Sequence, residues 1–220
     1  MNPQTHTPSN ELGEALHGRG GGPAGPGEWR SNGDDRGDHD RSRLATAKTG
    51  LWLFLATATV VFSMLLSAYL GRMDRPDWHL LPRLWILWLN TFFLILGSGT
   101  LEWARRSAHR DLREARFWLL TAGAFTLFFV IGQLIAWQEL SLAGYVLASN
   151  PSSSFFYLLT ALHGLHVLGG LLAWGWATVQ LLSGKGTERG VRSKIELCAI
   201  YWHFLLLVWL TLFGFFWFTQ

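Results

Sequence analysis

Five stretches of the 220-residue sequence contain no Asp, Glu, Lys or Arg, and they constrain the fold more than any other feature. They cover residues 51–70, 84–101, 117–138, 151–184 and 197–220. A helix rises about 1.5 Å per residue, so roughly 20 residues cross a bilayer core about 30 Å thick. No stretch alternates as a barrel strand would. The pattern predicts an all-α integral membrane bundle of five transmembrane helices, over about 50–70, 84–103, 117–138, 154–182 and 197–219.

The composition agrees with a membrane protein. Half of the residues are hydrophobic and 15% are charged, whereas soluble domains average about 25% charged residues. This balance argues against a soluble enzyme, a nucleic-acid-binding domain and a disordered protein. Residues 1–46 are the exception, with nine of the 24 glycines and mixed charges. We expect them to form a disordered polar tail before a transmembrane domain over 47–220.

The basic residues between the runs predict the orientation in the membrane. Five spans place twelve of them on one side: Arg41, Arg43, Lys48, Arg105, Arg106, Arg110, Arg113, Arg116, Lys185, Arg189, Arg192 and Lys194. The other side has three, namely Arg72, Arg75 and Arg83. Because basic residues concentrate in cytoplasmic loops, we expect a cytoplasmic N-terminus and a C-terminus on the outer side.

Histidines are the ionisable groups in the middle of the runs. His163 and His166 are three residues apart and share a helix face, and His203 lies in the last run. A single b-type haem between the last two helices is conceivable, which leaves a small independent membrane cytochrome open. The alternative is that the rings bond to neighbouring helices, lipid head groups or water. The absence of mid-membrane charge and of an inverted repeat argues against a transporter, and no catalytic motif stands out.

Small and amide side chains suggest where the helices pack. Thr59, Ser63, Ser67 and Gly71 recur every four residues, as do Gly169, Ala173 and Ala177. Close approach of membrane helices depends on such residues, so we expect each stripe to meet another helix, within the chain or across a subunit boundary. Asn90 and Gln133 are candidates for hydrogen bonds between helices.

Three segments resemble one known family. Residues 160–170 read T-A-L-H-G-L-H-V-L-G-G, and Glu196 is followed by the sequence Y-W-H-F over 201–204 and by Trp209. Residues 48–57 read K-T-G-L-W-L-F-L-A-T. These segments resemble the T-G-x-H-G-x-H-V-x-x-G, E-x-x-x-x-Y-W-H-F-V-D-x-x-W and K-x-G-M-W-L-F-L-A-S segments of subunit III of haem–copper oxidases, typified by cytochrome c oxidase. The likeness covers about 48–219 and points to the short, five-helix bacterial form.

The resemblance implies a non-redox accessory subunit of a terminal oxidase in the bacterial inner membrane, without a catalytic centre of its own. Haem and copper would belong to the partner subunits I and II. This chain would brace subunit I, hold phospholipid and support proton uptake. The histidines would then be structural or lipid-facing, and the expected polar anchors are His163, His166, Glu196, His203, Asn90 and Gln133. The expected contacts to lipid head groups are Arg105, Arg106, Arg192 and Lys194.

Three acids of the family pattern are missing. Ala58, Ala136 and Leu206 stand where the family usually has glutamate, glutamate and aspartate. Their loss lowers the cost of burial in lipid and argues against a role in which this subunit's own carboxylates hold protons. A similar accessory protein of nitric oxide reductases remains an alternative. The electron donor, cytochrome c or quinol, and the haem types of the partner stay open.

Overall fold

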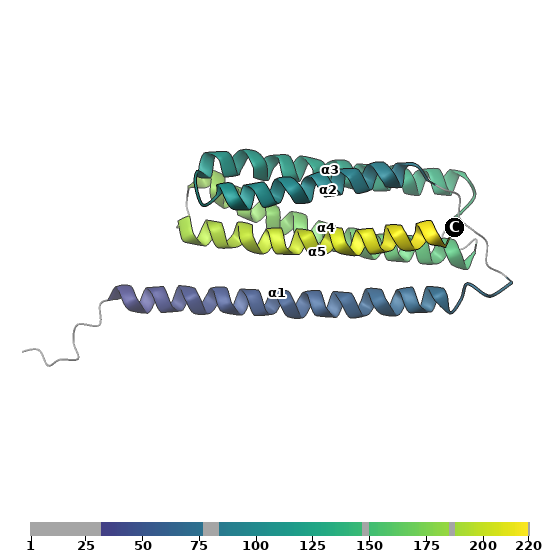
Figure 1. Cartoon of the computed structure of the whole chain (residues 1–220), viewed down its shortest axis with the longest axis horizontal. Helices are drawn as coiled ribbons and strands as arrows, with labels where there is room; N and C mark the ends of the chain where they lie inside the picture. The colour runs from purple at the N-terminus through teal and green to yellow at the C-terminus, as the bar shows by residue number, and fades with distance from the viewer. Residues whose placement is uncertain (1–31, 77–83, 147–149, 185–187, 220) are drawn as a thin grey trace, which may run out of the picture. The chain divides into compact units, whose positions relative to one another are not determined.

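A computed structural model of the chain describes residues 32–76, 84–146, 150–184 and 188–219. These residues form α-helices and no strand. The helices are α1 (Asn32–Leu70), α2 (Ile86–Ser107), α3 (Leu112–Leu142), α4 (Pro151–Ser183) and α5 (Glu188–Phe218), as Figure 1 shows. Residues 44–220 form one compact unit, and all contacts described below lie within it.

Every helix contains a segment that is long and apolar enough to cross a membrane. These segments are Ala45–Leu70, Ile86–Ser107, Leu112–Leu142, Pro151–Ser183 and Gly190–Phe218. The prediction of an all-α bundle of five transmembrane helices is therefore confirmed. Some helices continue past the charge-free runs, and long basic side chains near such helix ends can reach the membrane interface. Of the predicted tail, residues 1–31 lie outside the described residues, and the chain is helical from Asn32.

Local sequence signals define several helix ends. Asp111 precedes α3, and its side chain accepts a hydrogen bond from the Arg113 backbone N–H at 2.8 Å. Asn150 caps α4 in the same way through the Ser153 N–H at 3.0 Å, with Pro151 as the first helical residue. Gly184 ends α4 with a φ of 64°, a left-handed conformation that glycine adopts without strain.

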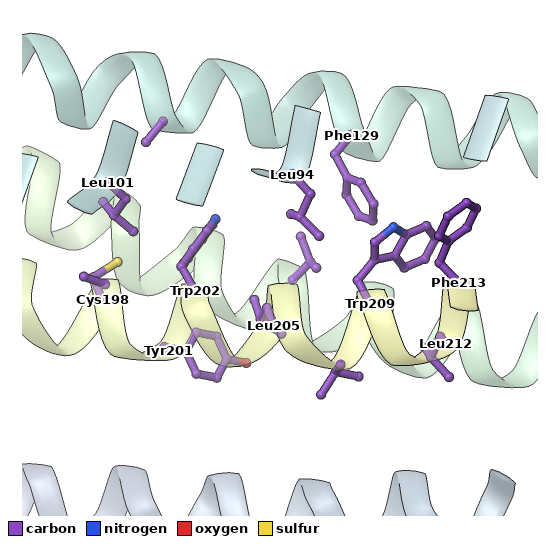
Figure 2. Close-up of a cluster of buried hydrophobic side chains, with 14 of the residues drawn as sticks. Leu94, Leu101, Phe129, Cys198, Tyr201, Trp202, Leu205, Trp209, Leu212 and Phe213 are labelled. Atoms are coloured by element: carbon purple, nitrogen blue, oxygen red, sulfur yellow. The ribbon is translucent and has the colours of Figure 1, made fainter. Parts of the chain in front are cut away.

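Helices α2 to α5 pack as a ring in which α2 contacts α3 and α5, and α4 contacts the same two helices. Large side chains fill the centre. Figure 2 shows Trp202 and Trp209 extending from α5 toward Leu94, Leu101 and Phe129, and all five are buried. The aromatic rings therefore form much of the contact between α5 and its neighbours.

Two of the glycines show how closely neighbouring helices approach. A Cβ on Gly132 of α3 would lie 2.0 Å from Asn90 Oδ1 of α2. A Cβ on Gly170 of α4 would lie 2.6 Å from the Trp202 ring of α5. Neither site has room for a side chain, so both glycines set the spacing of their helices.

Helix α1 packs against the others along a narrow stripe. Its buried residues are Leu55, Ala58, Phe62 and Tyr69, at the spacings of a seven-residue repeat that follows one helix face. Tyr69 contacts the Phe215 ring of α5 with a centroid distance of 4.7 Å. The small residues from Thr59 to Gly71 are exposed, and Thr59 and Ser63 line a small hollow beside α5. A subunit boundary remains the alternative for this stripe.

Candidate functional site

Three indole N–H groups donate to threonine hydroxyls on a neighbouring helix. The pairs are Trp209 with Thr91 at 2.9 Å, Trp137 with Thr160 at 3.1 Å, and Trp202 with Thr126 at 3.2 Å. Each threonine in turn donates to the carbonyl four residues earlier, at 2.7 to 2.9 Å. All three hydroxyls thus donate and accept at once. The indole and hydroxyl groups gain hydrogen-bond partners that hydrocarbon does not offer.

The sequence contains no specific signal for these pairs. Trp202 and Trp209 lie inside a charge-free run rather than at its ends, where tryptophans of the interfacial belt belong. That position indicates a buried indole in need of an acceptor. Which threonine supplies the acceptor depends on helix register, which only the structure gives.

The two amides predicted to bond between helices do meet. Asn90 Nδ2 of α2 donates to Gln133 Oε1 of α3 at 3.2 Å, and both residues are buried. Asn90 Oδ1 and Gln133 Nε2 have no hydrogen-bond partner among the described residues. The pair links α2 to α3 at the close approach of Gly132.

His163 lies inside the bundle, with 1% of its surface exposed. Its ring is surrounded by Trp209, Phe129 and Phe62, at centroid distances of 5.2, 5.9 and 6.5 Å. Neither ring nitrogen has a hydrogen-bond partner in the described part of the chain. His163 is therefore an interior residue in aromatic surroundings, and it does not face lipid.

The other two histidines have different neighbours. His166 Nδ1 lies 2.7 Å from the Leu162 carbonyl oxygen, and its ring contacts Phe54 and Phe62 of α1. His203 is exposed on α5, and its Nδ1 lies 2.6 Å from the Ala199 carbonyl oxygen. Across the described ranges, no group of three or more His, Cys, Asp or Glu side chains could hold a metal ion.

Charged groups gather where α2 ends and α5 begins. Glu102 accepts hydrogen bonds from Arg105 at 2.7 and 2.8 Å and from Arg106 at 2.9 Å. Glu196 pairs with Lys48 of α1 at 3.0 Å. The partner of Glu196 therefore lies on another helix.

The remaining predicted head-group contacts lie at the start of α5. Lys194 donates to the Gln180 side chain and lies over the Trp176 ring, 4.4 Å from its centroid. Arg192 is half-buried. Both lie two or three turns before the first buried tryptophan of α5, Trp202.

The positions of the missing acids are well defined. Ala58 is buried on α1 between Phe54 and Phe62, the residues that contact the rings of His166 and His163. Ala136 is buried in α3 and Leu206 is half-buried in α5. A carboxylate at Ala58 or Ala136 would be enclosed by apolar side chains, which only a close partner could offset.

Hollows flank α1 on two sides. One, of about 400 Å³, lies between α1, α4 and α5 and is lined by Phe54, Gly169, Ala173, Trp176, Lys194 and Tyr201 among others. The second, of about 450 Å³, is bordered by Trp52 of α1, Glu102 and Arg105 of α2, and His203 of α5. Each joins an apolar interior to a charged residue.

Known proteins resemble this chain over most of its length. A family model described as cytochrome c oxidase subunit III matches residues 29–220. The chain belongs to this family. A probable cytochrome c oxidase subunit 3 of Mycobacterium tuberculosis is 36% identical over 124 residues, which cover 56% of this chain and 61% of the relative. The chain thus spans about three fifths of the length of that relative.

Two further relatives match longer parts of the chain. Subunit 3 of the cytochrome bo(3) ubiquinol oxidase of Pseudomonas aeruginosa is 27% identical over 80% of this chain and 87% of its own length. A haem–copper oxidase subunit I+III of Aeropyrum pernix is 26% identical over 76% of this chain and 22% of its own length. The subunit III family thus includes members from oxidases with different names.

Proposed function

We propose that the chain is the non-redox accessory subunit III of a haem–copper terminal oxidase in a bacterial plasma membrane. The observation that carries this is the family match over 29–220, which includes all five spanning helices. Haem and copper belong to the partner subunits I and II. The subunit I+III of Aeropyrum pernix supports subunit I as the neighbour, because its name places both subunits in one chain.

The distribution of basic residues supports a cytoplasmic N-terminus and a C-terminus on the outer side. In this orientation the ion pairs of Glu102 and Glu196 lie near the cytoplasmic face. Arg105, Arg106, Arg192 and Lys194 then lie at the depth of the lipid head groups, where anionic lipid attracts basic side chains.

The hollow between α1, α4 and α5 supports phospholipid binding. Its walls are mainly apolar, as an acyl chain requires, and Lys194 stands at its border as a cation for a phosphate group. Gly169 and Ala173, part of the small-residue stripe of α4, line it without filling it.

Support of proton uptake is indirect in this chain. Ala58, Ala136 and Leu206 stand where the family usually has acids, so these three positions offer no carboxylate that could carry protons for the partner. The subunit acts by bracing subunit I and by holding lipid beside it.

Purification of the tagged chain in mild detergent tests this function. We expect subunits I and II of a haem–copper oxidase to co-purify, with oxygen reduction by the complex. Co-purification with a complex that reduces nitric oxide would assign the chain to a nitric oxide reductase. A chain that purifies alone and carries haem would contradict the proposal.

A further inference from the structure

Helix α1 is joined to the bundle by side chains rather than by close approach of the backbones. Among the described residues, no Cα atom of α1 lies within 8 Å of a Cα atom of another helix, whereas each of α2 to α5 approaches two neighbours within that distance. The most apolar window of α1 is also the least buried of the five. A helix with few buried contacts moves at a smaller cost than the helices of a packed core.

One end of α1 is firmly packed. Tyr69 is 2% exposed, and its ring contacts Phe215 of α5 and Phe155 of α4 at centroid distances of 4.7 and 5.7 Å. The Tyr69 hydroxyl lies 3.2 Å from the hydroxyl of Thr219 near the end of the chain. Contacts to two helices therefore fix this end of α1.

Hollows that border α1 widen toward its other end. The hollow beside Thr59 has a volume of about 90 Å³. The hollow beside Leu51 and Phe54 has about 400 Å³, and the one beside Trp52 has about 450 Å³. Packing around α1 therefore loosens with distance from Tyr69.

An ion pair joins the loosely packed end of α1 to α5. Lys48 Nζ lies 3.0 Å from Glu196 Oε1, and the two side chains are 46% and 38% exposed. Ala47 and Leu197, the chain neighbours of these two residues, both line the hollow between α1, α4 and α5. The ion pair thus lies at the border of this hollow, and pairs of such exposure are weak enough to break often.

We infer that α1 is a hinged strap over the hollow between α1, α4 and α5, which pivots near Tyr69 and is latched by the ion pair between Lys48 and Glu196. Release of the latch lets the Lys48 end of α1 move away from α4 and α5, so that an acyl chain enters or leaves the hollow from the bilayer. The inference rests on the proposed function for the occupant, a phospholipid. It goes further in naming the element that opens the site and the contact that controls it.

The single cysteine of the chain reports on this motion. Cys198 lines the hollow and is 5% exposed, so a reagent reaches its thiol when α1 moves away. In membranes that contain the assembled complex, mass spectrometry of this chain measures the rate at which N-ethylmaleimide adds to Cys198. Lys48→Glu replaces an attraction by a repulsion, and we expect roughly two- to fivefold faster addition.

A charge swap separates the latch from a general loosening of the fold. Lys48→Glu combined with Glu196→Lys restores the pair with reversed charges and should return the rate to near that of the unsubstituted chain. Arg105 does not oppose the new lysine strongly, because Glu102 pairs with it at 2.7 Å. Arg113→Glu, an exposed charge reversal on α3, is the matched control and should leave the rate unchanged.

Three results would overturn the latch. They are an unchanged rate in Lys48→Glu, a rate in the charge swap as fast as in Lys48→Glu, and an equal acceleration by Arg113→Glu.

Exchange of bound lipid tests the consequence of the motion. The complex is placed in nanodiscs of deuterium-labelled phosphatidylglycerol, and native mass spectrometry follows replacement of the phospholipid bound to this chain. We expect Lys48→Glu to speed this exchange by a factor similar to that for Cys198. Faster labelling without faster exchange would overturn the role of α1 in lipid entry. Absence of subunit I from preparations of the unsubstituted chain would instead contradict the proposed function, and the Cys198 rates would still decide the motion.

Discussion

At Thr91, Thr126 and Thr160, one hydroxyl group forms hydrogen bonds with two helices. Each accepts from an indole N–H and donates to a carbonyl of its own helix. The carbonyl that accepts from the hydroxyl belongs to the same helix and keeps its backbone hydrogen bond when threonine is replaced by valine. The substitution therefore leaves only the indole N–H without a partner. A double-mutant cycle can therefore isolate the bond between the indole and the hydroxyl in each pair.

We expect Trp209→Phe and Thr91→Val to be coupled. Interhelical hydrogen bonds in membrane proteins contribute about 0.6 kcal/mol on average and up to about 2 kcal/mol. A double-mutant cycle on the free energy of unfolding in detergent should give a coupling of about 0.5–1.5 kcal/mol. Trp209→Phe combined with Thr57→Val is the control pair. Strict additivity of the Thr91 pair would show that the bond contributes nothing.

His163 presents the opposite situation, a buried ring with both nitrogens unpaired. We expect His163→Phe to leave the free energy of unfolding unchanged or to raise it by up to about 2 kcal/mol, because an apolar ring of similar shape removes unsatisfied polar atoms. Gln133→Leu is the control of opposite sign, since it strands Asn90 and should cost about 1–3 kcal/mol. Marked destabilisation by His163→Phe would mean that the imidazole has a partner.

At the scale of the helices, the packing of α2 to α5 depends on points of close approach, whereas α1 depends on one stripe. Gly170 of α4 lies against the Trp202 ring, while Gly164 on the same helix has nothing within 4 Å of an added Cβ. Buried residues of α1 are few: 17% of its most apolar window is buried, against 33–39% in the other four spanning segments.

The two glycines of α4 give a matched test. Gly170→Ala forces a Cβ into the indole and should lower the free energy of unfolding by about 1–3 kcal/mol. Gly164→Ala meets open space and should raise it by up to about 1 kcal/mol through helix propensity. Equal effects of the two substitutions in the same unfolding assay would contradict the packing of α4 against α5.

Helix α1 should be the first element to open in the isolated chain. Its ion pair between Lys48 and Glu196 is partly exposed and contributes little, at most about 1 kcal/mol. Hydrogen exchange in detergent should therefore be faster in Leu51–Leu70 than in α3 or α5. Equal protection of all five helices in the isolated chain would contradict this description.

At the scale of the whole molecule, the sequence predicts the spanning helices, because the bilayer limits which segments can cross it. Hydrocarbon accepts no unpaired backbone and few charges, so charge-free runs such as 117–138 mark their helices directly. The pairing of Asn90 with Gln133 could be anticipated, because few polar side chains lie in the spans. The interior place of His163 and the outward face of His203 could not, because a sequence motif does not give the rotation of a helix about its axis.

We propose that this chain belongs to a redox complex without taking part in electron transfer. The most direct measurement separates the chain from its purified complex with a stronger detergent and records the haem absorption of both fractions. We expect all haem absorption to stay with the catalytic subunits and none with this chain. A Soret band that follows the isolated chain, and that is lost in His163, His166 or His203 variants, would contradict the account.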